Sequence, residues 1–289
     1  MRTLDETNIT DVVLSHLGED TDPRLREILQ GLVTHLHCFV RDTHITHREW
    51  ALAIDFLKRS GEITDGMRNE FILLSDVLGV SSLVDLINST PQATSCSALG
   101  PFHIADTPVR TFGADLKGDF DSEVMLVKGQ VCDTDNTPIS GATVDVWQNA
   151  PNGMYSSQDP NQDTYSFHGV FVTDESGRYA FTTARPLAYT VPTDGPAGEI
   201  LHSTGRNAWR PAHLHYMVRA DGFLPLVTEA FPDDDPYLDK DAIFGVRDDL
   251  VFSVKRADAS SFPQGFELTG KVDAPYAQVE FDFILSKER

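Results

Sequence analysis

One stretch decides the architecture of this sequence, Trp209-Arg210-Pro211-Ala212-His213-Leu214-His215-Tyr216-Met217-Val218. From Ala212 onward, apolar and β-branched residues alternate with period two, which predicts a β-strand. Because successive side chains of a strand point to opposite faces, His213 and His215 share one face, with Cα atoms about 6.5–7 Å apart. Two imidazoles at that separation can bind one metal ion. Taken alone, however, a His-x-His pair fits two half-exposed strand histidines equally well.

The size and charge of the chain limit its function. Its 289 residues can build one large domain, or a main and a smaller domain, around a sizeable core. The 23 lysines and arginines against 44 aspartates and glutamates leave a formal net charge of −21, which argues against a nucleic acid partner. The cysteines are odd in number and lack metal-site spacing, so free thiols are expected at Cys38, Cys96 and Cys132.

Targeting signals and several standard catalytic motifs are missing from the sequence. No apolar run is long enough to span a bilayer, and Met1–Glu6 carries no apolar signal-peptide core, so a cytoplasmic location is expected. The sequence also contains no Gly-x-Ser-x-Gly elbow, no glycine-rich phosphate loop and no His-Glu-x-x-His motif. The candidate chemistry therefore rests on the two histidines and their surroundings.

Residues 1 to about 90 are predicted to be helical. Asp22-Pro23 combines an N-cap with proline at the first helical position. One apolar stripe follows at helical spacing: Leu25, Ile28, Leu29, Leu32, Leu36, Phe39 and Val40. The capping box Thr46-x-x-Glu49 begins a second helix. Thr64 begins a third helix, which ends before Gly79, and a short helix is expected around 82–88.

The pattern changes beyond the polar, proline-containing segment 89–94. Alternating runs between turn residues predict strands at 124–131, 143–147, 170–173, 179–183, 213–219, 250–254, 266–272 and 278–284. Many short strands with little helix between them favour a β-sandwich or barrel over βαβ units. We expect a mainly β protein with a helical N-terminal domain, residues 1–92, and a β domain, residues 93–289.

Two tyrosines lie in loop settings upstream of the histidines. Tyr155 follows a Pro-Asn-Gly turn, in the context Gly-Met-Tyr-Ser, and Tyr189 lies in the segment 185–192. Each tyrosine alone is more often a residue at the edge of the core than a metal ligand. Tyr165 is a competitor, but it lacks the Gly-x-Tyr-Ser setting, so Tyr155 is preferred.

The order of these residues, with Arg210 three positions before His213, resembles the intradiol ring-cleavage dioxygenases. The resemblance covers most of residues 96–255 and, more weakly, the helical region. It implies an antiparallel β-sandwich catalytic domain and a non-haem Fe(III) ion. The iron ligands that it implies are Tyr155, Tyr189, His213 and His215. Phenolate and imidazole suit iron, and two phenolates supply charge that stabilises the ferric state.

The resemblance also implies the reaction. An aromatic diol binds the iron as a dianion, Tyr189 accepts one of its protons, and O2 opens the ring between the hydroxyl-bearing carbons to give a dicarboxylic acid. Arg210 is expected either to stabilise negative charge on the ring or to form a salt bridge. Glu229 follows a predicted strand at a position where catechol-type members often carry glutamine. We expect Glu229 to pair with Arg210 or with a histidine ligand.

The segments Leu99–His103 and Thr190–Pro192 are more similar to hydroxyquinol-cleaving members than to catechol or chlorocatechol enzymes. The implied substrate is benzene-1,2,4-triol, and the product is 3-hydroxy-cis,cis-muconate, the enol form of maleylacetate. Asp76 either accepts a hydrogen bond from the third ring hydroxyl or lies on a helix surface. The substrate contacts implied are Leu73, Asp76, Gly100, Pro101, Phe102, Val191, Pro192 and Arg210.

The apolar stripes of the helical region look wider than one small helical layer needs, which indicates burial against a partner. The resemblance makes that partner a second copy of the chain, with phospholipid bound between the copies. Two other functions compete with the dioxygenase. One is a ligand-binding β-sandwich with zinc on His213 and His215, and the other is a zinc hydrolase. Zinc prefers His, Cys and carboxylate ligands to paired tyrosinates, which disfavours both.

Overall fold

The computed structural model describes residues 3–66, 68–264, 266 and 274–288. The chain divides into two compact units, Met1–Arg59 and Ser60–Arg289, and each is described by itself. The predicted domain division at residues 92 and 93 stays a prediction. In the described part of the chain, no helix has both the length and the apolar character needed to cross a membrane.

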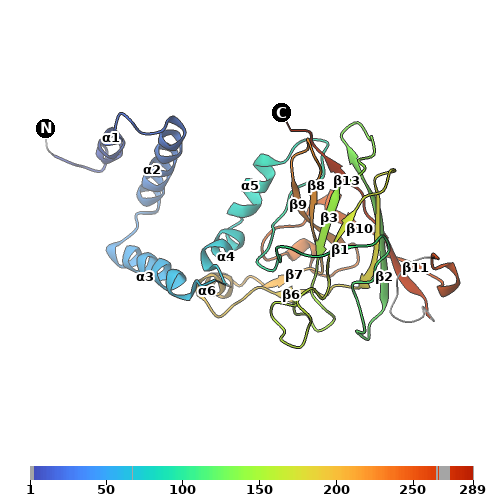
Figure 1. Cartoon of the computed structure of the whole chain (residues 1–289). Coiled ribbons are helices and arrows are strands. Elements are labelled where there is room, and N and C mark those ends of the chain that lie inside the picture. The colour runs from blue at the N-terminus through green and yellow to red at the C-terminus, as the bar shows by residue number, and fades with distance from the viewer. Residues whose placement is uncertain (1–2, 67, 265, 267–273, 289) are drawn as a thin grey trace. The chain divides into compact units, whose positions relative to one another are not determined.

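The first unit consists of α1 (Ile9–Ser15), α2 (Pro23–Thr43) and most of α3 (His47–Ile63) (Figure 1). The predicted caps are present. The side chain of Asp22 accepts a hydrogen bond from the Leu25 amide at 2.9 Å, and Thr46 and Glu49 bond to each other's amides as a capping box. None of the α2 side chains is buried, so its apolar stripe faces outward from this unit.

Three further helices belong to the second unit: α4 (Glu70–Val77), α5 (Val80–Asn88) and α6 (Pro196–Ser203). The prediction that a helix begins at Thr64 is wrong. The Asn69 side chain caps α4 by accepting hydrogen bonds from the amides of Phe71 and Ile72, so the helix begins at Glu70. Helix α6 was not predicted, and it lies next to α4 (Figure 1).

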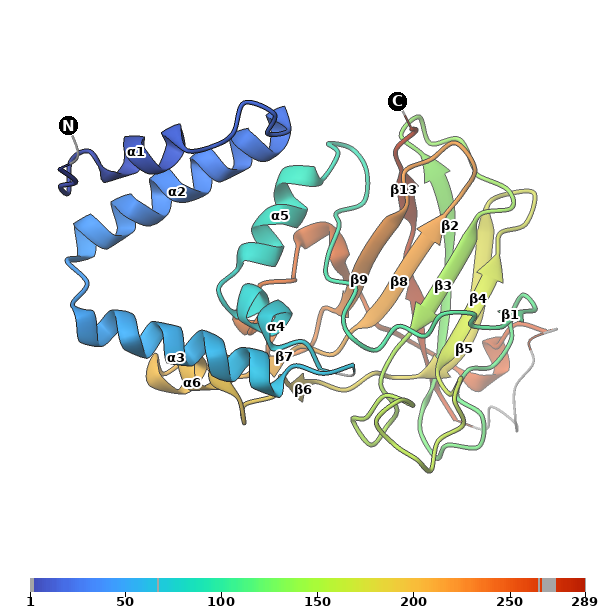
Figure 2. The same ribbon diagram turned by 60° about the vertical axis from the view of Figure 1, so that its left-hand side comes forward.

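The rest of the second unit is a β-sandwich (Figures 1 and 2). A six-stranded sheet has the order β1-β4-β3-β8-β9-β10, and a five-stranded sheet has the order β11-β12-β2-β13 with β5 beside β2. Strands β6 and β7 pair separately. The bounds are β1 Val109–Arg110, β2 Val124–Asp133, β3 Thr143–Trp147, β4 His168–Val172, β5 Arg178–Ala184, β6 Tyr189–Thr190, β7 Trp209–Arg210, β8 Leu214–Arg219, β9 Leu226–Pro232, β10 Val251–Phe252, β11 Lys255–Ala257, β12 Tyr276–Glu280 and β13 Phe283–Leu285.

The two sheets enclose one core, to which alternate residues of β2, β3, β5, β8, β12 and β13 contribute. Val146 and Tyr216 of the first sheet join Val127 and Phe181 of the second in a single cluster of buried side chains. The pairs β3/β4, β3/β8, β8/β9 and β2/β5 are antiparallel, as predicted, whereas β12 and β13 run parallel to β2.

Three details differ from the predicted strands. His213 lies one residue before β8, which begins at Leu214. Glu229 lies inside β9 rather than after it, because the apolar pattern of Leu226–Pro232 continues on both sides of the carboxylate. The predicted strand 250–254 is reduced to a 3-10 turn and the short β10. Most of the predicted strand 266–272 lies outside the described residues.

Candidate metal centre

His213 and His215 meet at the end of β8. The Nε2 atoms of the two rings are 3.2 Å apart, and both side chains are buried. The ring of His213 is held by a hydrogen bond between Nδ1 and the carbonyl oxygen of Pro211 at 2.7 Å. Because Nδ1 donates this bond, Nε2 is left as a lone-pair donor that faces the other imidazole. The expected shared face is therefore present in the folded chain.

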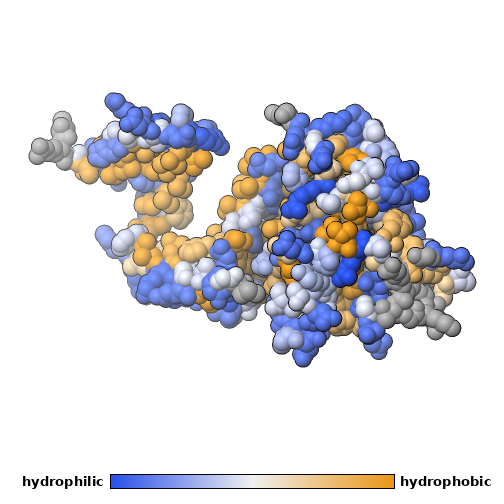
Figure 3. Space-filling model, viewed as in Figure 1, coloured by the Kyte–Doolittle hydropathy of each residue, from blue (hydrophilic) through white to orange (hydrophobic). Residues whose placement is uncertain are grey.

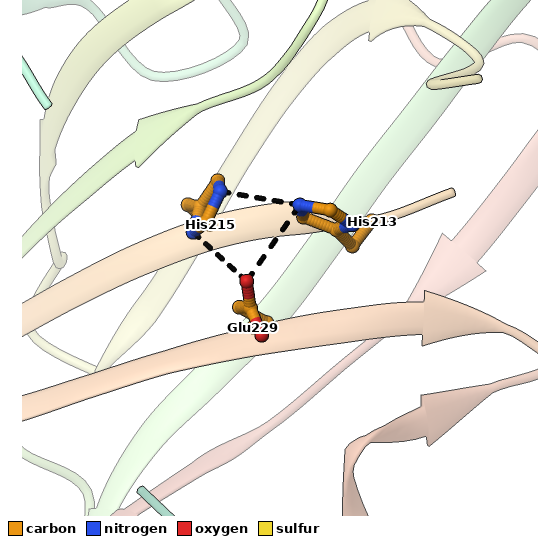
Figure 4. Close-up of side chains that lie close together, drawn as sticks. All are labelled: His213, His215 and Glu229. Atoms are coloured by element: carbon orange, nitrogen blue, oxygen red, sulfur yellow. Dashed lines mark hydrogen bonds and ion pairs between the residues drawn. The ribbon is translucent and has the colours of Figure 1, made fainter. Parts of the chain in front are cut away.

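Glu229 completes a triangle with the two histidines (Figure 4). It lies directly opposite His215 in the β8/β9 pair. Its Oε1 atom is 3.6 Å from His213 Nε2 and 3.4 Å from His215 Nδ1. Among the described residues, these three form the group whose donor atoms all lie within 4.8 Å of one another and could hold a metal ion.

Both predicted tyrosines lie beside this triangle. The Tyr155 hydroxyl is 3.4 Å from His213 Nε2, and the centroid of the Tyr189 ring is 5.5 Å from that of His213. The two phenol rings meet edge to face at 5.9 Å. Tyr155 leaves the sheet after a turn in which Gly153 has a φ of +80°, as the Pro-Asn-Gly pattern predicts. Tyr189 of β6 pairs with Arg210 of β7.

Burial keeps the histidines and tyrosines of this site neutral. Burial, with the nearby Arg210 charge, lowers the pKa of His213 to about 4, and it lowers the pKa of His215 well below its ordinary value. Burial also raises the pKa of both Tyr155 and Tyr189. Neutral imidazoles bind metals directly, whereas a phenol must lose its proton first. The site therefore favours a cation that is charged enough to displace that proton.

Arg210 is buried and contacts two carboxylates. Its NH1 and NH2 groups donate to the two oxygens of Glu229 at 2.7 and 2.8 Å, and Nε donates to Asp241 at 3.2 Å. Ser97 donates a further hydrogen bond to Glu229 Oε2 at 2.7 Å. Burial raises the pKa of Glu229, but the Arg210 charge and its hydrogen bonds to the carboxylate outweigh this effect, and the net result is a lower pKa. Both predicted contacts of Glu229 are observed.

Sequence patterns did not identify several neighbours of the site. Asp241 and Ser97 belong to no motif, because their roles depend on loops that fold back beside β7 and β9. Trp147 is the one of these neighbours that the sequence could have indicated, because it ends the predicted strand 143–147. It ends β3 directly opposite His215, and the two rings stack with centroids 5.0 Å apart and an angle of 3°.

The predicted substrate residues divide into two groups. Phe102 stacks on Tyr155, and Gly100 lies against the His215 ring. Leu73 of α4 packs in one apolar cluster with Val77 and Val191. Asp76, also on α4, is half-buried, and burial raises its pKa while Ser81 and the Arg210 charge act in the opposite direction. By contrast, Pro101 and Pro192 are exposed.

Comparison with known proteins decides the family. The family described as "Catechol dioxygenase N terminus" matches residues 22–95, and the family described as "Dioxygenase" matches residues 99–287. Hydroxyquinol 1,2-dioxygenase of Rhizobium sp. (strain MTP-10005) is 42% identical over 285 residues, which are 98% of this chain and 96% of the relative. The chain belongs to the intradiol ring-cleavage dioxygenases.

Two further similarities extend over the whole of this intradiol dioxygenase. The 6-chlorohydroxyquinol 1,2-dioxygenase of Cupriavidus pinatubonensis (strain JMP 134 / LMG 1197) is 39% identical and covers 99% of both chains. The solved structure of hydroxyquinol 1,2-dioxygenase from Pseudomonas putida DLL-E4 has a TM-score of 0.89 and 42% identity, and it covers 98% of this chain and 99% of that one. The helical region and the sandwich are thus both part of the family fold.

Intradiol dioxygenases are iron-binding oxidoreductases of aromatic catabolism, and an aromatic diol is their substrate. The chain's donors fit non-haem iron. Two imidazole nitrogens, two phenols and one carboxylate face one buried point, and no thiolate takes part among the described residues. An iron cation would also face the negative charge of Glu229, which lies against both histidines.

Proposed function

We propose that this dioxygenase opens the ring of benzene-1,2,4-triol with O2, giving 3-hydroxy-cis,cis-muconate, the enol form of maleylacetate. The observation that carries the proposal is Asp76. This half-buried carboxylate on α4 is close enough to Arg210 and Glu229 to respond to their charges. It offers a hydrogen-bond acceptor to a third ring hydroxyl, which catechol lacks. Two relatives of this chain, named above, are hydroxyquinol dioxygenases.

The metal of this proposal is Fe(III), with Tyr155, Tyr189, His213 and His215 as its ligands. Glu229 is assigned a supporting role, because Arg210 and Ser97 already donate three hydrogen bonds to its two oxygens. The phenols are the remaining oxygen donors beside the histidines. When bound, ferric iron withdraws electron density from the chelated diol, so that a ring carbon becomes reactive toward O2.

The residues of the chain then have separate tasks. Tyr189 accepts a proton as the diol binds. The pairing of its backbone with β7 and the contact of its ring with His213 hold it beside the site. Arg210 directs NH1 toward the site, 3.3 Å from His213 Nε2, although the two carboxylates that it pairs with together carry more charge than it does. The ring of Phe102 covers Tyr155 and keeps water from the phenol.

The test is a comparison of two substrates on the purified iron enzyme. An unpaired buried acceptor costs about 1–3 kcal/mol, so catechol should have a kcat/KM about one to two orders of magnitude below that of the triol. Oxygen uptake and product absorbance measure both rates. Equal kcat/KM values for the two diols would assign the chain to the catechol or chlorocatechol branch instead.

We further propose that the helical region forms a homodimer. Large apolar side chains of α2 and α3 are exposed (Figure 3), and an isolated surface of this extent is unfavourable in water. They are Leu25, Ile28, Leu32, Leu36, Phe39 and Val40 on α2, and Trp50, Leu52, Ile54 and Leu57 on α3. A second copy can cover this surface symmetrically. Phospholipid chains between the copies would fill the remaining apolar space, and solvent extraction followed by mass spectrometry tests for them.

A further inference from the structure

The segment Gly100–His103 lies directly against two of the proposed iron ligands. Gly100 has a φ of +71°, and a Cβ at this position would lie 3.0 Å from the Cε1 atom of His215. The Phe102 ring stacks on Tyr155 with centroids 4.3 Å apart and an angle of 20°. A displacement of this segment would therefore change the packing around both His215 and Tyr155.

His103 ties the segment to the sheet. Its Nε2 donates a hydrogen bond of 2.8 Å to Oδ2 of Asp145, which is a buried residue of β3. Within the described residues, this is the one hydrogen bond made by residues 99–103. Without it, apolar contacts alone would hold the segment in place.

The anchor shares a tryptophan with the metal site. The His103 ring meets Trp147 edge to face at 4.7 Å, and Trp147 stacks on His215. Asp145 and Trp147 lie two residues apart on β3, so they share one face of the sheet. His103, Asp145 and Trp147 thus form a continuous set of contacts that ends on a proposed ligand.

A second metal site is the alternative explanation of this cluster, because His168 lies opposite Trp147 on β4 and is fully buried. A metal site there would need at least three ligand atoms that converge on one point. Among the described residues, only His213, His215 and Glu229 bring three donors within 4.8 Å of one another. The geometry favours an anchor over a cation site.

We propose that His103 and Asp145 are positioning residues that hold Gly100–Phe102 against the metal site and so set the affinity for the diol. The inference rests on the proposed function, because that function makes Tyr155 and His215 the ligands. Positioning acts mainly on substrate binding, since His103 itself does not contact the proposed ligands. A displacement of the segment by about 1 Å is enough to weaken a productive complex severely.

The test compares four variants of the full-length iron enzyme. His103→Phe keeps a ring against Trp147 but loses the hydrogen bond, and Asp145→Leu removes the same bond from the other side. Asp145→Asn keeps an acceptor oxygen. His168→Phe is the matched control, because it changes an imidazole next to Trp147 whose ring nitrogens have no hydrogen-bond partner among the described residues.

We expect His103→Phe and Asp145→Leu each to raise KM for the triol about five- to tenfold, with kcat changed less than about twofold. The amides of 99–103 should exchange with deuterium faster, and the visible iron–tyrosinate band should shift as Phe102 moves. Asp145→Asn and His168→Phe should retain wild-type values. The double variant His103→Phe/Asp145→Leu should be no worse than either single variant.

The exchange measurement needs no substrate, so it separates this inference from the proposed function. If wild-type enzyme turns over neither triol nor catechol, the proposed function fails, and deuterium exchange still decides the anchor. Wild-type exchange and KM in both His103→Phe and Asp145→Leu would overturn the anchor. If one of these variants does not fold, the other measures the same bond.

Discussion

Arg210 and Glu229 form a bidentate ion pair inside the sandwich, with exposed side-chain fractions of 4% and 0%. Asp241 also accepts a hydrogen bond from Arg210, so one guanidinium faces two carboxylates. This buried cluster carries one excess negative charge. Because Glu229 also lies against both histidines, that charge is directed at the proposed iron site.

Removing Glu229 should destabilise the iron-free protein. Breaking a buried ion pair costs about 3–5 kcal/mol, and Glu229→Ala is expected near the lower value because Asp241 still pairs with Arg210. Glu229→Gln should cost less, since the amide oxygen still accepts a hydrogen bond. Urea unfolding followed by circular dichroism measures both. Equal stability of wild type and Glu229→Ala would contradict the assigned ion pair.

Tyr155→Phe should remove the visible colour, most of the iron and the activity together. The phenolate is a proposed ligand, and charge transfer from tyrosinate to ferric iron gives such centres a red to brown colour. Metal analysis and a visible spectrum provide the measurement. Tyr165→Phe is the control, because Tyr165 makes no ring contact with the histidines among the described residues. An active, colourless preparation with stoichiometric zinc would refute the ferric site.

Asp76→Ala should narrow the preference for the triol over catechol by about one to two orders of magnitude. The loss should fall on the triol, because only the triol carries the hydroxyl that Asp76 is proposed to bind. The measurement is kcat/KM for both diols on wild type and variant. A variant with the wild-type ratio would show that Asp76 is a helix-surface residue.

His168 should make the iron-free protein sensitive to acid. Burial, with a smaller effect of His103, lowers the pKa of His168 from 6.5 to about 4, so the folded state favours its neutral form. The contribution of the neutral His168 to the free energy of unfolding is complete above 6.5, its pKa in the unfolded chain. It is lost as the pH falls from 6.5 toward 4. At pH 5 the loss is about 2 kcal/mol relative to pH 7. In urea unfolding, the free energy of unfolding of His168→Phe should fall less than that of wild type between pH 7 and pH 5, by about this amount. The same pH dependence in variant and wild type would contradict the assigned role of His168.

Charges on the apolar face of α2 should separate the proposed dimer. Leu32→Asp with Leu36→Asp places two carboxylates on the exposed stripe, where burial against a partner would be strongly unfavourable. Light scattering should report a monomer for this variant and a dimer for wild type. Gln30→Asp, at another exposed position of α2, is the control. A wild-type monomer at micromolar concentration would contradict the proposed interface.

Much of the fold could be predicted because its signals are local. The Asp22 cap, the Thr46–Glu49 capping box and the period-two strands depend on residues within a few positions of one another. The start of α4 depends on the local Asn69 cap, which the prediction overlooked, whereas helix α6 was missed because distant contacts position it. The Glu70 carboxylate accepts a hydrogen bond from the Ala197 amide, and Arg68 pairs with Glu70 and with Asp194. Contacts across such a separation leave no periodic trace.

The candidate site shows the same division. The His-x-His pair and the loop tyrosines are visible in the sequence, and the structure brings all four side chains together. The carboxylate network around Arg210 could be anticipated only in part. Glu229 was identified from its position, whereas Asp241 comes from a loop 31 residues beyond Arg210. Buried charge pairing depends on the whole packing, which a single sequence does not reveal.

The pairing of β2 has a consequence for how the chain is made. This strand, Val124–Asp133, takes β5 as one neighbour and β12 and β13 as the others, and those two come from Tyr276–Leu285. During synthesis on the ribosome, one edge of β2 therefore stays unpaired until residues 276–285 have emerged. During that interval the unpaired edge can pair wrongly with other chains, so synthesis is the stage at which this fold is most exposed to aggregation.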